Sequence, residues 1–171
     1  MPADALLHPM AMLAVIALLA NDHIAKALWP GVVTGKVSDI AGLAFFPLFL
    51  VGIWEVAQSG LGRWKHPTVT PIVVASLATA SVFTLVKTTI LGATVWAGFL
   101  GAGRYLAGVP AAVLTGANGP AFVAVTVVRD ATDLVALPAI LVANWIGVRR
   151  AQSAMPWRNA SIFVQWTLGR K

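Results

Sequence analysis

The chain has no cysteine and few charged residues, and both shortages narrow what it can be. Without cysteine it has no disulfide, no thiol nucleophile and no thiolate metal site. Charged residues make up 11% of its 171 residues, whereas a soluble domain carries about 25%. Apolar residues make up 58% of the chain, and its mean hydropathy is +0.83. We therefore expect lipid, rather than water, to cover most of its surface.

The familiar catalytic and nucleotide-binding signatures are also missing. The sequence contains no HExxH motif, no GxSxG motif and no P-loop. A net charge of +6 would suggest a nucleic-acid partner in a soluble protein, but here the basic residues lie in predicted loops and in the tail, where they set orientation. We therefore expect no nucleic-acid partner. No metal or cofactor is predicted, because lysines and an arginine lie among the carboxylates that would have to bind a cation.

Four apolar stretches predict four transmembrane helices, at about 6–28, 38–57, 71–91 and 131–148. Residues 92–130 are also apolar but contain Pro110, Pro120 and several glycines. We expect this part to be irregular or re-entrant, with 121–128 extended, and a fifth span is the alternative. The predicted fold is an all-α membrane protein forming a single integral membrane domain. It is a bundle of about four transmembrane helices with an irregular, partly membrane-associated segment between the third and fourth.

Two details of the second span depend on its polar residues. Val32–Lys36 is predicted to be a short polar turn, after which Ser38 and Asp39 would cap the helix. Glu55 lies within one turn of the other end. Its carboxylate is therefore expected to extend to the membrane surface.

Basic residues predict the orientation of the bundle. With four spans, the loop at 58–67, the end of the last span and the tail at 151–171 lie on one side. They hold seven of the 12 basic residues: Arg63, Lys65, Arg149, Arg150, Arg158, Arg170 and Lys171. The positive-inside rule makes this side cytoplasmic, so the basic tail and the C-terminus are predicted to be cytoplasmic.

The remaining charged and polar residues gather at the opposite membrane boundary. Ionised groups in lipid cost about 2.5–3.5 kcal/mol each, so they should face one another. The catalytic candidates, as general bases, are Asp22, His23 and Asp39. The ligand-binding candidates are Lys26, Lys36, Ser38, Lys87, Arg129, Asp130 and Asp133. The basic members of this set suit an anionic group, such as a lipid phosphate or a carboxylate.

Each member of this cluster also has a purely structural interpretation. Asp22 and Lys26 have the i,i+4 spacing of an ordinary helix ion pair. Asp130 is placed to cap the last span, with Asp133 in its first turn, where it could pair with Arg129.

Three functional hypotheses follow from the sequence. The first is a non-enzymatic membrane protein that binds or passes a small anionic or lipid-headgroup ligand at this cluster. The second is a lipid-modifying hydrolase or transferase, and the third is a structural protein whose charges only anchor the helices. Membrane lipid is the expected partner, with a small anionic ligand as a second, and protein partners are not indicated.

Two segments resemble a group of small, uncharacterised bacterial integral membrane proteins. They are NDHIAKALWPGVVTGKVSDIAGLAFFP at 21–47 and RDATDLVALPAILVANW at 129–145, together about 45 of 171 residues. The pattern is N-D-H…K…T-G-K-x-S-D-x-x-G-L…F-P, followed by R-D-x-T-D-L-x-A-L-P. The resemblance implies a bacterial inner-membrane location and no established activity. A fainter likeness to the VanZ-like family lacks that family's Asp-Lys-x-x-His order, so no residue is carried over from it.

Overall fold

The computed structural model describes residues 1–29, 31–115, 119 and 121–154. Every regular element among these residues is a helix, which confirms the predicted all-α membrane fold. Within this part of the chain, five helices are long and apolar enough to cross a membrane: Pro9–Leu28, Val32–Gly60, Val69–Thr88, Ile90–Thr115 and Ala131–Ser153. The chain divides into two compact units. Unit 1 comprises Met1–Ala80 and the residues from Ala136 onward, and unit 2 comprises Ser81–Val135.

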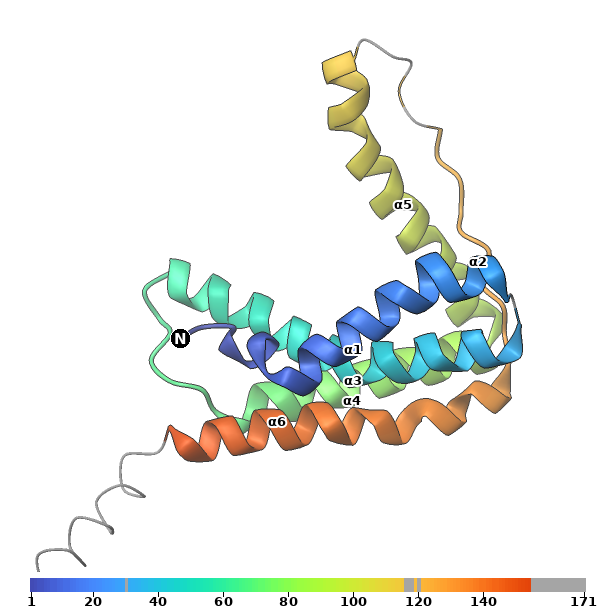
Figure 1. Cartoon of the computed structure of the whole chain (residues 1–171). Helices are drawn as coiled ribbons and strands as arrows, with labels where there is room; N and C mark the ends of the chain where they lie inside the picture. Colours follow the sequence, from blue (N-terminus) through green and yellow to red (C-terminus); the bar gives the residue numbers. More distant parts are fainter. Residues whose placement is uncertain (30, 116–118, 120, 155–171) are drawn as a thin grey trace, which may run out of the picture. The chain divides into compact units, whose positions relative to one another are not determined.

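Unit 1 is a layer of long helices that lie side by side (Figure 1). Its elements are the short 3-10 helix η1 (Asp4–Leu7), α1 (Pro9–Ala20), the π-helical turn η2 (Asn21–Ala25), α2 (Lys26–Leu28), α3 (Val32–Gly60), the first part of α4 (Val69–Thr88), the end of the 3-10 helix η3 (Ala131–Ala139), and α6 (Ile140–Ser153). The first three helical pieces after η1 form one continuous span, Pro9–Leu28.

Small residues dominate the core of unit 1. Its buried members are Ala5, Ala11, Leu48, Val51, Ile72, Ala75, Ala143 and Ile146. Many larger apolar side chains, such as Leu13, Ile53 and Leu77, are exposed instead. This distribution suits a helix bundle in lipid, where close backbone approach and van der Waals contact hold helices together and large side chains face the acyl chains.

The start of α3 corrects two predictions. Val32–Lys36 is helical rather than a turn, and the N-cap residue is Gly31, whose N–H donates to Thr34 Oγ1 over 3.2 Å. Ser38 and Asp39 therefore lie inside the helix and do not cap it. The 29 residues of α3 rise about 44 Å at ~1.5 Å each, more than the ~30 Å hydrocarbon core. Val32–Lys36 therefore belongs to helical turns that extend α3 beyond the length of the hydrocarbon core.

Unit 2 contains a helix where an irregular segment was predicted. Residues 92–115 belong to α5 (Ile90–Thr115), so the first part of the predicted irregular segment at 92–130 is wrong. Glycine and proline, which suggested irregularity, are more frequent in transmembrane helices than in soluble ones. Residues 121–130 form no regular element, which agrees with the predicted extended stretch.

The extended stretch runs back beside α5. The Val125 N–H donates to the Ala97 carbonyl over 3.2 Å. A Cβ added at Gly101 would lie 2.8 Å from the Val123 carbonyl oxygen, so this close approach requires glycine. We call the chain between Lys87 and Asp133 the excursion. It begins and ends at the same place, because Asp133 contacts Lys87 at the end of α4. The chain therefore leaves α4 and comes back to the same end of it.

Gly147 is a point of close contact between α4 and α6. A Cβ at this position would lie 2.6 Å from Cγ1 and 2.8 Å from Cβ of Ile72, which is almost completely buried. Since the Ile72 Cβ is fixed to the backbone of α4, the two helices would have to separate. We expect Gly147→Ala to lower the free energy of unfolding by about 1–3 kcal/mol, the usual effect of overpacking, measured by denaturation in detergent micelles.

Gly42→Ala is the matched control for this substitution. It lies inside α3, and an added Cβ there would meet nothing within 4 Å. Alanine should then slightly stabilise the helix, because its helix propensity exceeds that of glycine. Equal effects of the two substitutions would contradict the assigned α4–α6 contact.

Candidate functional site

The first half of the predicted cluster is built on a π-helical turn. In η2 the N–H of Lys26 bonds to the carbonyl of Asn21, five residues earlier, instead of four. The Asn21 side chain is buried, and its Nδ2 donates to the Thr34 carbonyl (2.6 Å) and to Ser38 Oγ (2.7 Å). Asn21 thus joins the end of the first span to the first two turns of α3. Single π-turns of this kind are frequent at functional sites.

Asp22 is held by this network on one side and by a lysine on the other. Its Oδ1 accepts a hydrogen bond from Ser38 Oγ and lies 2.7 Å from Lys26 Nζ. The predicted i,i+4 pair of Asp22 and Lys26 is confirmed, and both side chains are 41% exposed. An ion pair this exposed contributes only about 0–1 kcal/mol to stability. The pair therefore adds little to the stability of the fold.

The other candidates of unit 1 lie close to this pair along the sequence. His23 follows Asp22 and is exposed. Lys36 and Asp39 lie on α3 beside Ser38 along the sequence, and both have interaction partners. Within the described residues, no group of three or more histidine, aspartate or glutamate side chains is arranged to hold a metal ion.

The second half of the predicted cluster lies in unit 2. Lys87 Nζ is 2.7 Å from Asp133 Oδ2, and the two side chains are only 14% and 12% exposed. The Lys87 ammonium also lies 5.4 Å from the centre of the Phe83 ring, within cation–π range. The structure therefore pairs Asp133 with Lys87, and Arg129, the partner considered from the sequence, is exposed. This nearly buried pair closes the base of the excursion.

Asp130 has the structural role that was considered for it. Its Oδ1 accepts the N–H of Thr132 over 2.8 Å at the start of η3, which confirms it as a capping residue. The ten predicted residues thus fall into two groups with their own internal contacts. Asp22, His23, Lys26, Lys36, Ser38 and Asp39 belong to unit 1, and Lys87, Arg129, Asp130 and Asp133 belong to unit 2.

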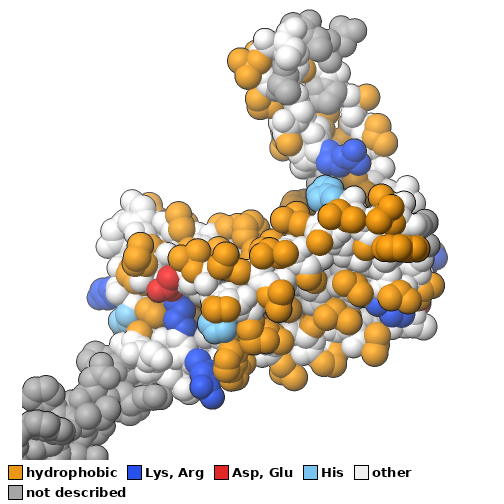
Figure 2. Space-filling view, in the orientation of Figure 1, with side chains coloured by type: hydrophobic (Ala, Val, Ile, Leu, Met, Phe, Trp, Pro, Cys, Tyr) orange, Lys and Arg blue, Asp and Glu red, His pale blue; other side chains and the backbone are white. Residues whose placement is uncertain are grey.

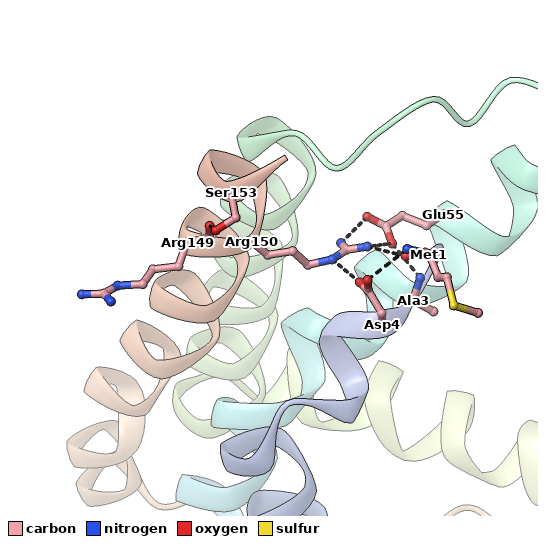
Figure 3. A network of polar contacts seen from close by, with 7 residues as sticks. All are labelled: Met1, Ala3, Asp4, Glu55, Arg149, Arg150 and Ser153. Carbon is pink, nitrogen blue, oxygen red and sulfur yellow. Dashed lines mark hydrogen bonds and ion pairs between the residues drawn. The ribbon is translucent and has the colours of Figure 1, made fainter. Parts of the chain in front are cut away.

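A third polar network, which the sequence did not predict, lies at the other end of unit 1 (Figure 3). Glu55 is only 4% exposed, and Arg150 binds it with two nitrogens, at 2.6 Å to Oε1 and 2.9 Å to Oε2. The Ala3 N–H donates to Glu55 Oε2 over 2.8 Å. The guanidinium also donates to the Met1 carbonyl and forms an ion pair with Asp4.

This network overturns the prediction that Glu55 extends to the membrane surface. Its carboxylate is an internal acceptor with three hydrogen bonds, one from Ala3 and two from Arg150. The sequence did hold a signal, since Glu55 is the chain's single glutamate and Arg150 ends the last apolar stretch. An ionisable group in a membrane helix usually has a partner on another helix. The pairing also places the end of α3 and the end of α6 at the same end of unit 1. This agrees with the predicted four-span topology, in which the chain crosses the membrane twice between these two points.

An apolar groove of about 370 Å³ lies between α4 and the η3–α6 segment in unit 1. Its lining includes Val73, Leu77, Leu137 and Leu141, with Ser76 and Asn144 as polar members. No residue of the predicted cluster lines it, so this groove is separate from the candidate site.

Comparisons with family models, with curated proteins and with solved structures find no match for this chain. The resemblance of 21–47 and 129–145 to small bacterial membrane proteins stays a prediction.

Proposed function

We propose that this multi-pass membrane protein is a lipid-headgroup-binding protein without catalytic activity, and that its site is formed by η2 and the first turns of α3. The observation that carries this proposal is the half-exposed Asp22–Lys26 ion pair. Ser38 donates a hydrogen bond to Asp22 and accepts one from Asn21, which holds the carboxylate in place. We refer to these four residues as the Asp22 site.

The balance of charge at the Asp22 site favours a zwitterionic headgroup over a simple anion. The ammonium of Lys26 is offset by the carboxylate of Asp22, so a purely anionic ligand would meet repulsion as well as attraction. A headgroup with a phosphate and a primary amine, such as phosphatidylethanolamine, complements both charges at once. Because the exposed pair is weakly held, exchanging its partners costs little.

The position of the Asp22 site suits a lipid ligand. Trp29, which follows α2, is exposed, and tryptophan is enriched at the level of lipid headgroups. The span Pro9–Leu28 has 20 residues, about the length that crosses the hydrocarbon core. Asp22 lies in its last two turns, where headgroups are already concentrated, so a weak intrinsic affinity is enough.

We also propose the bacterial inner membrane as the location, with the ends of α3 and α6 at the cytoplasmic face. Support comes from Arg63 and Lys65 in the loop after α3 and from Arg149 and Arg150 in the last turns of α6. These residues are the positive charges that the positive-inside rule counts.

The test of the Asp22 site is selective retention of phosphatidylethanolamine. Lys26→Met and Asp22→Asn should each reduce the retained phosphatidylethanolamine about fivefold relative to phosphatidylcholine, because each removes one charge-assisted contact. Retained lipid would be measured by native mass spectrometry after purification from nanodiscs of the two lipids. Phosphatidylcholine is the reference because its quaternary amine cannot donate a hydrogen bond to Asp22.

Lys65→Met serves as the matched control, since it removes the same charge from an exposed loop position outside the site. It should leave the lipid ratio unchanged. Wild-type selectivity in both Lys26→Met and Asp22→Asn would rule the site out.

A structural role for the charges is the second candidate function, and two observations favour it. The Glu55–Arg150 and Lys87–Asp133 pairs are nearly buried and join segments far apart in the sequence. Loss of stability without loss of lipid selectivity in variants of every charged pair would support this reading. A lipid-modifying activity of Asp22, His23 and Asp39 stays a prediction, to be tested by phospholipid turnover that depends on His23.

A further inference from the structure

A second set of exposed polar groups lies beside the Glu55–Arg150 network, on the last turns of α6. Asp4 and Glu55 both contact Arg150. The neighbouring Arg149 points away from this network (Figure 3) and is exposed. Among the described residues, no ion pair involves Arg149. Its positive charge therefore remains open to a ligand.

Arg149 is held in place by an aromatic side chain. Its guanidinium carbon lies 5.0 Å from the centre of the Trp145 ring, a cation–π contact across one turn of α6. Trp145 is 44% exposed, so the stacked pair stays accessible. A planar guanidinium fixed in this way loses less freedom on binding an oxyanion than a free one does.

His8 adds a hydrogen-bond donor next to the stacked pair. Its ring packs edge-on against Trp145, with centroids 5.7 Å apart. His8 also caps α1, because its Nδ1 accepts the N–H of Met10 over 3.3 Å. A neutral imidazole that accepts at Nδ1 carries its proton on Nε2. The cap on α1 therefore uses Nδ1 of His8 and leaves its proton on Nε2.

Unit 1 carries further basic residues after the end of α3. Arg63 and Lys65, in the loop after α3, are exposed, whereas the acidic residues of this end, Asp4 and Glu55, contact Arg150. Figure 2 shows basic, histidine and acidic side chains next to hydrophobic ones at the end of unit 1 that carries the N-terminus. Cationic, aromatic and apolar groups at one helix end are the combination found at the level of lipid headgroups.

We propose that Arg149, Trp145 and His8 form a binding site for the phosphate of an anionic phospholipid. The guanidinium donates hydrogen bonds to the phosphate oxygens, the imidazole Nε2–H donates another, and the exposed indole packs beside the glycerol backbone. Both nearby carboxylates, Asp4 and Glu55, contact Arg150, and neither forms an ion pair with Arg149 among the described residues. The site therefore selects anionic lipids such as phosphatidylglycerol, in contrast to the Asp22 site.

The test measures phosphatidylglycerol retained by the full chain in mixed phosphatidylglycerol–phosphatidylcholine nanodiscs, by native mass spectrometry. The assay is run at about 1 M NaCl, where the screening length falls to about 3 Å and diffuse attraction is suppressed. Arg149→Lys and Trp145→Leu should each lower retention about tenfold, because both remove the stacking of the guanidinium on the indole ring. Arg149→Lys keeps the positive charge, so its effect would not come from charge alone. His8→Asn should lower it about threefold, since asparagine still caps α1 but lacks the second ring N–H.

Arg63→Lys is the matched control, because it makes the same exchange at an exposed arginine outside the site. It should retain phosphatidylglycerol like the wild type. Equal retention in Arg149→Lys and Arg63→Lys, with unchanged thermal stability, would overturn the proposal, as would full displacement of the lipid by inorganic phosphate. Lys26→Met should leave phosphatidylglycerol retention unchanged, so the two lipid sites can fail independently.

Discussion

Replacing Arg150 with alanine is expected to lower the free energy of unfolding by about 3–5 kcal/mol. The Glu55 carboxylate is almost completely buried and takes two hydrogen bonds from the Arg150 guanidinium. Without that partner, a carboxylate would be left ionised or forced to bind a proton inside a membrane bundle. The effect would be measured by denaturant unfolding in detergent micelles, following the seven tryptophans by fluorescence.

Two variants separate the ion pair from other effects of the substitution. Arg149→Ala, one residue earlier and exposed, should change the unfolding free energy by less than about 0.5 kcal/mol. The double substitution Glu55→Gln/Arg150→Met should be more stable than Arg150→Ala, since it leaves no unpaired charge. If Arg149→Ala proved as damaging as Arg150→Ala, the network of Figure 3 would not be what holds this end of unit 1 together.

The membrane fold could be predicted because it depends on composition summed over long windows. A 20-residue apolar stretch has few alternatives to a membrane helix, since lipid leaves no other way to satisfy its backbone. For this reason α1, α3, α4 and α6 were all found, with errors confined to their ends. The polar residues up to Lys36 predict that α3 starts at Ser38, whereas it starts at Val32, because its 29 residues are longer than the hydrocarbon core requires.

The wrong predictions concern the segment 92–115 and the environment of Glu55. Residues 92–115 were predicted to be irregular because of Pro110 and several glycines, but transmembrane helices tolerate both residue types. Glu55 was assigned to the membrane surface because its partner Arg150 is 95 positions away. Only packing of α3 against α6 reveals that pair.

The candidate site could be predicted in its parts but not in its pairings. Asp22 with Lys26 followed from i,i+4 spacing, and Asp130 as a cap followed from its place before an apolar run. Asn21 was missed because its importance comes from burial against Thr34 and Ser38, which requires α3 to begin earlier than predicted. Lys87 and Asp133 were both singled out, but they are 46 positions apart and α5 lies between them.

Removing that last pair should loosen unit 2 without unfolding unit 1. Lys87→Met leaves the Asp133 carboxylate, only 12% exposed, without its ammonium partner at the base of the excursion. We expect a local loss of about 3 kcal/mol, seen as roughly hundredfold faster hydrogen exchange in 121–130 and the adjoining turns of α5. The exchange rates of α1 and α3 should stay unchanged.

The charge swap Lys87→Asp/Asp133→Lys should recover much of this protection, because it restores an ion pair at the same place. Arg104→Met is the matched control, since it removes one basic residue from an exposed position of α5. Faster exchange in Arg104→Met as well, or no recovery in the swap, would mean that net charge and not the Lys87–Asp133 contact keeps the excursion closed. If the contact is confirmed, the returning chain is fixed at the end of α4, and the excursion adds a helix without moving α6 to the other side of the membrane.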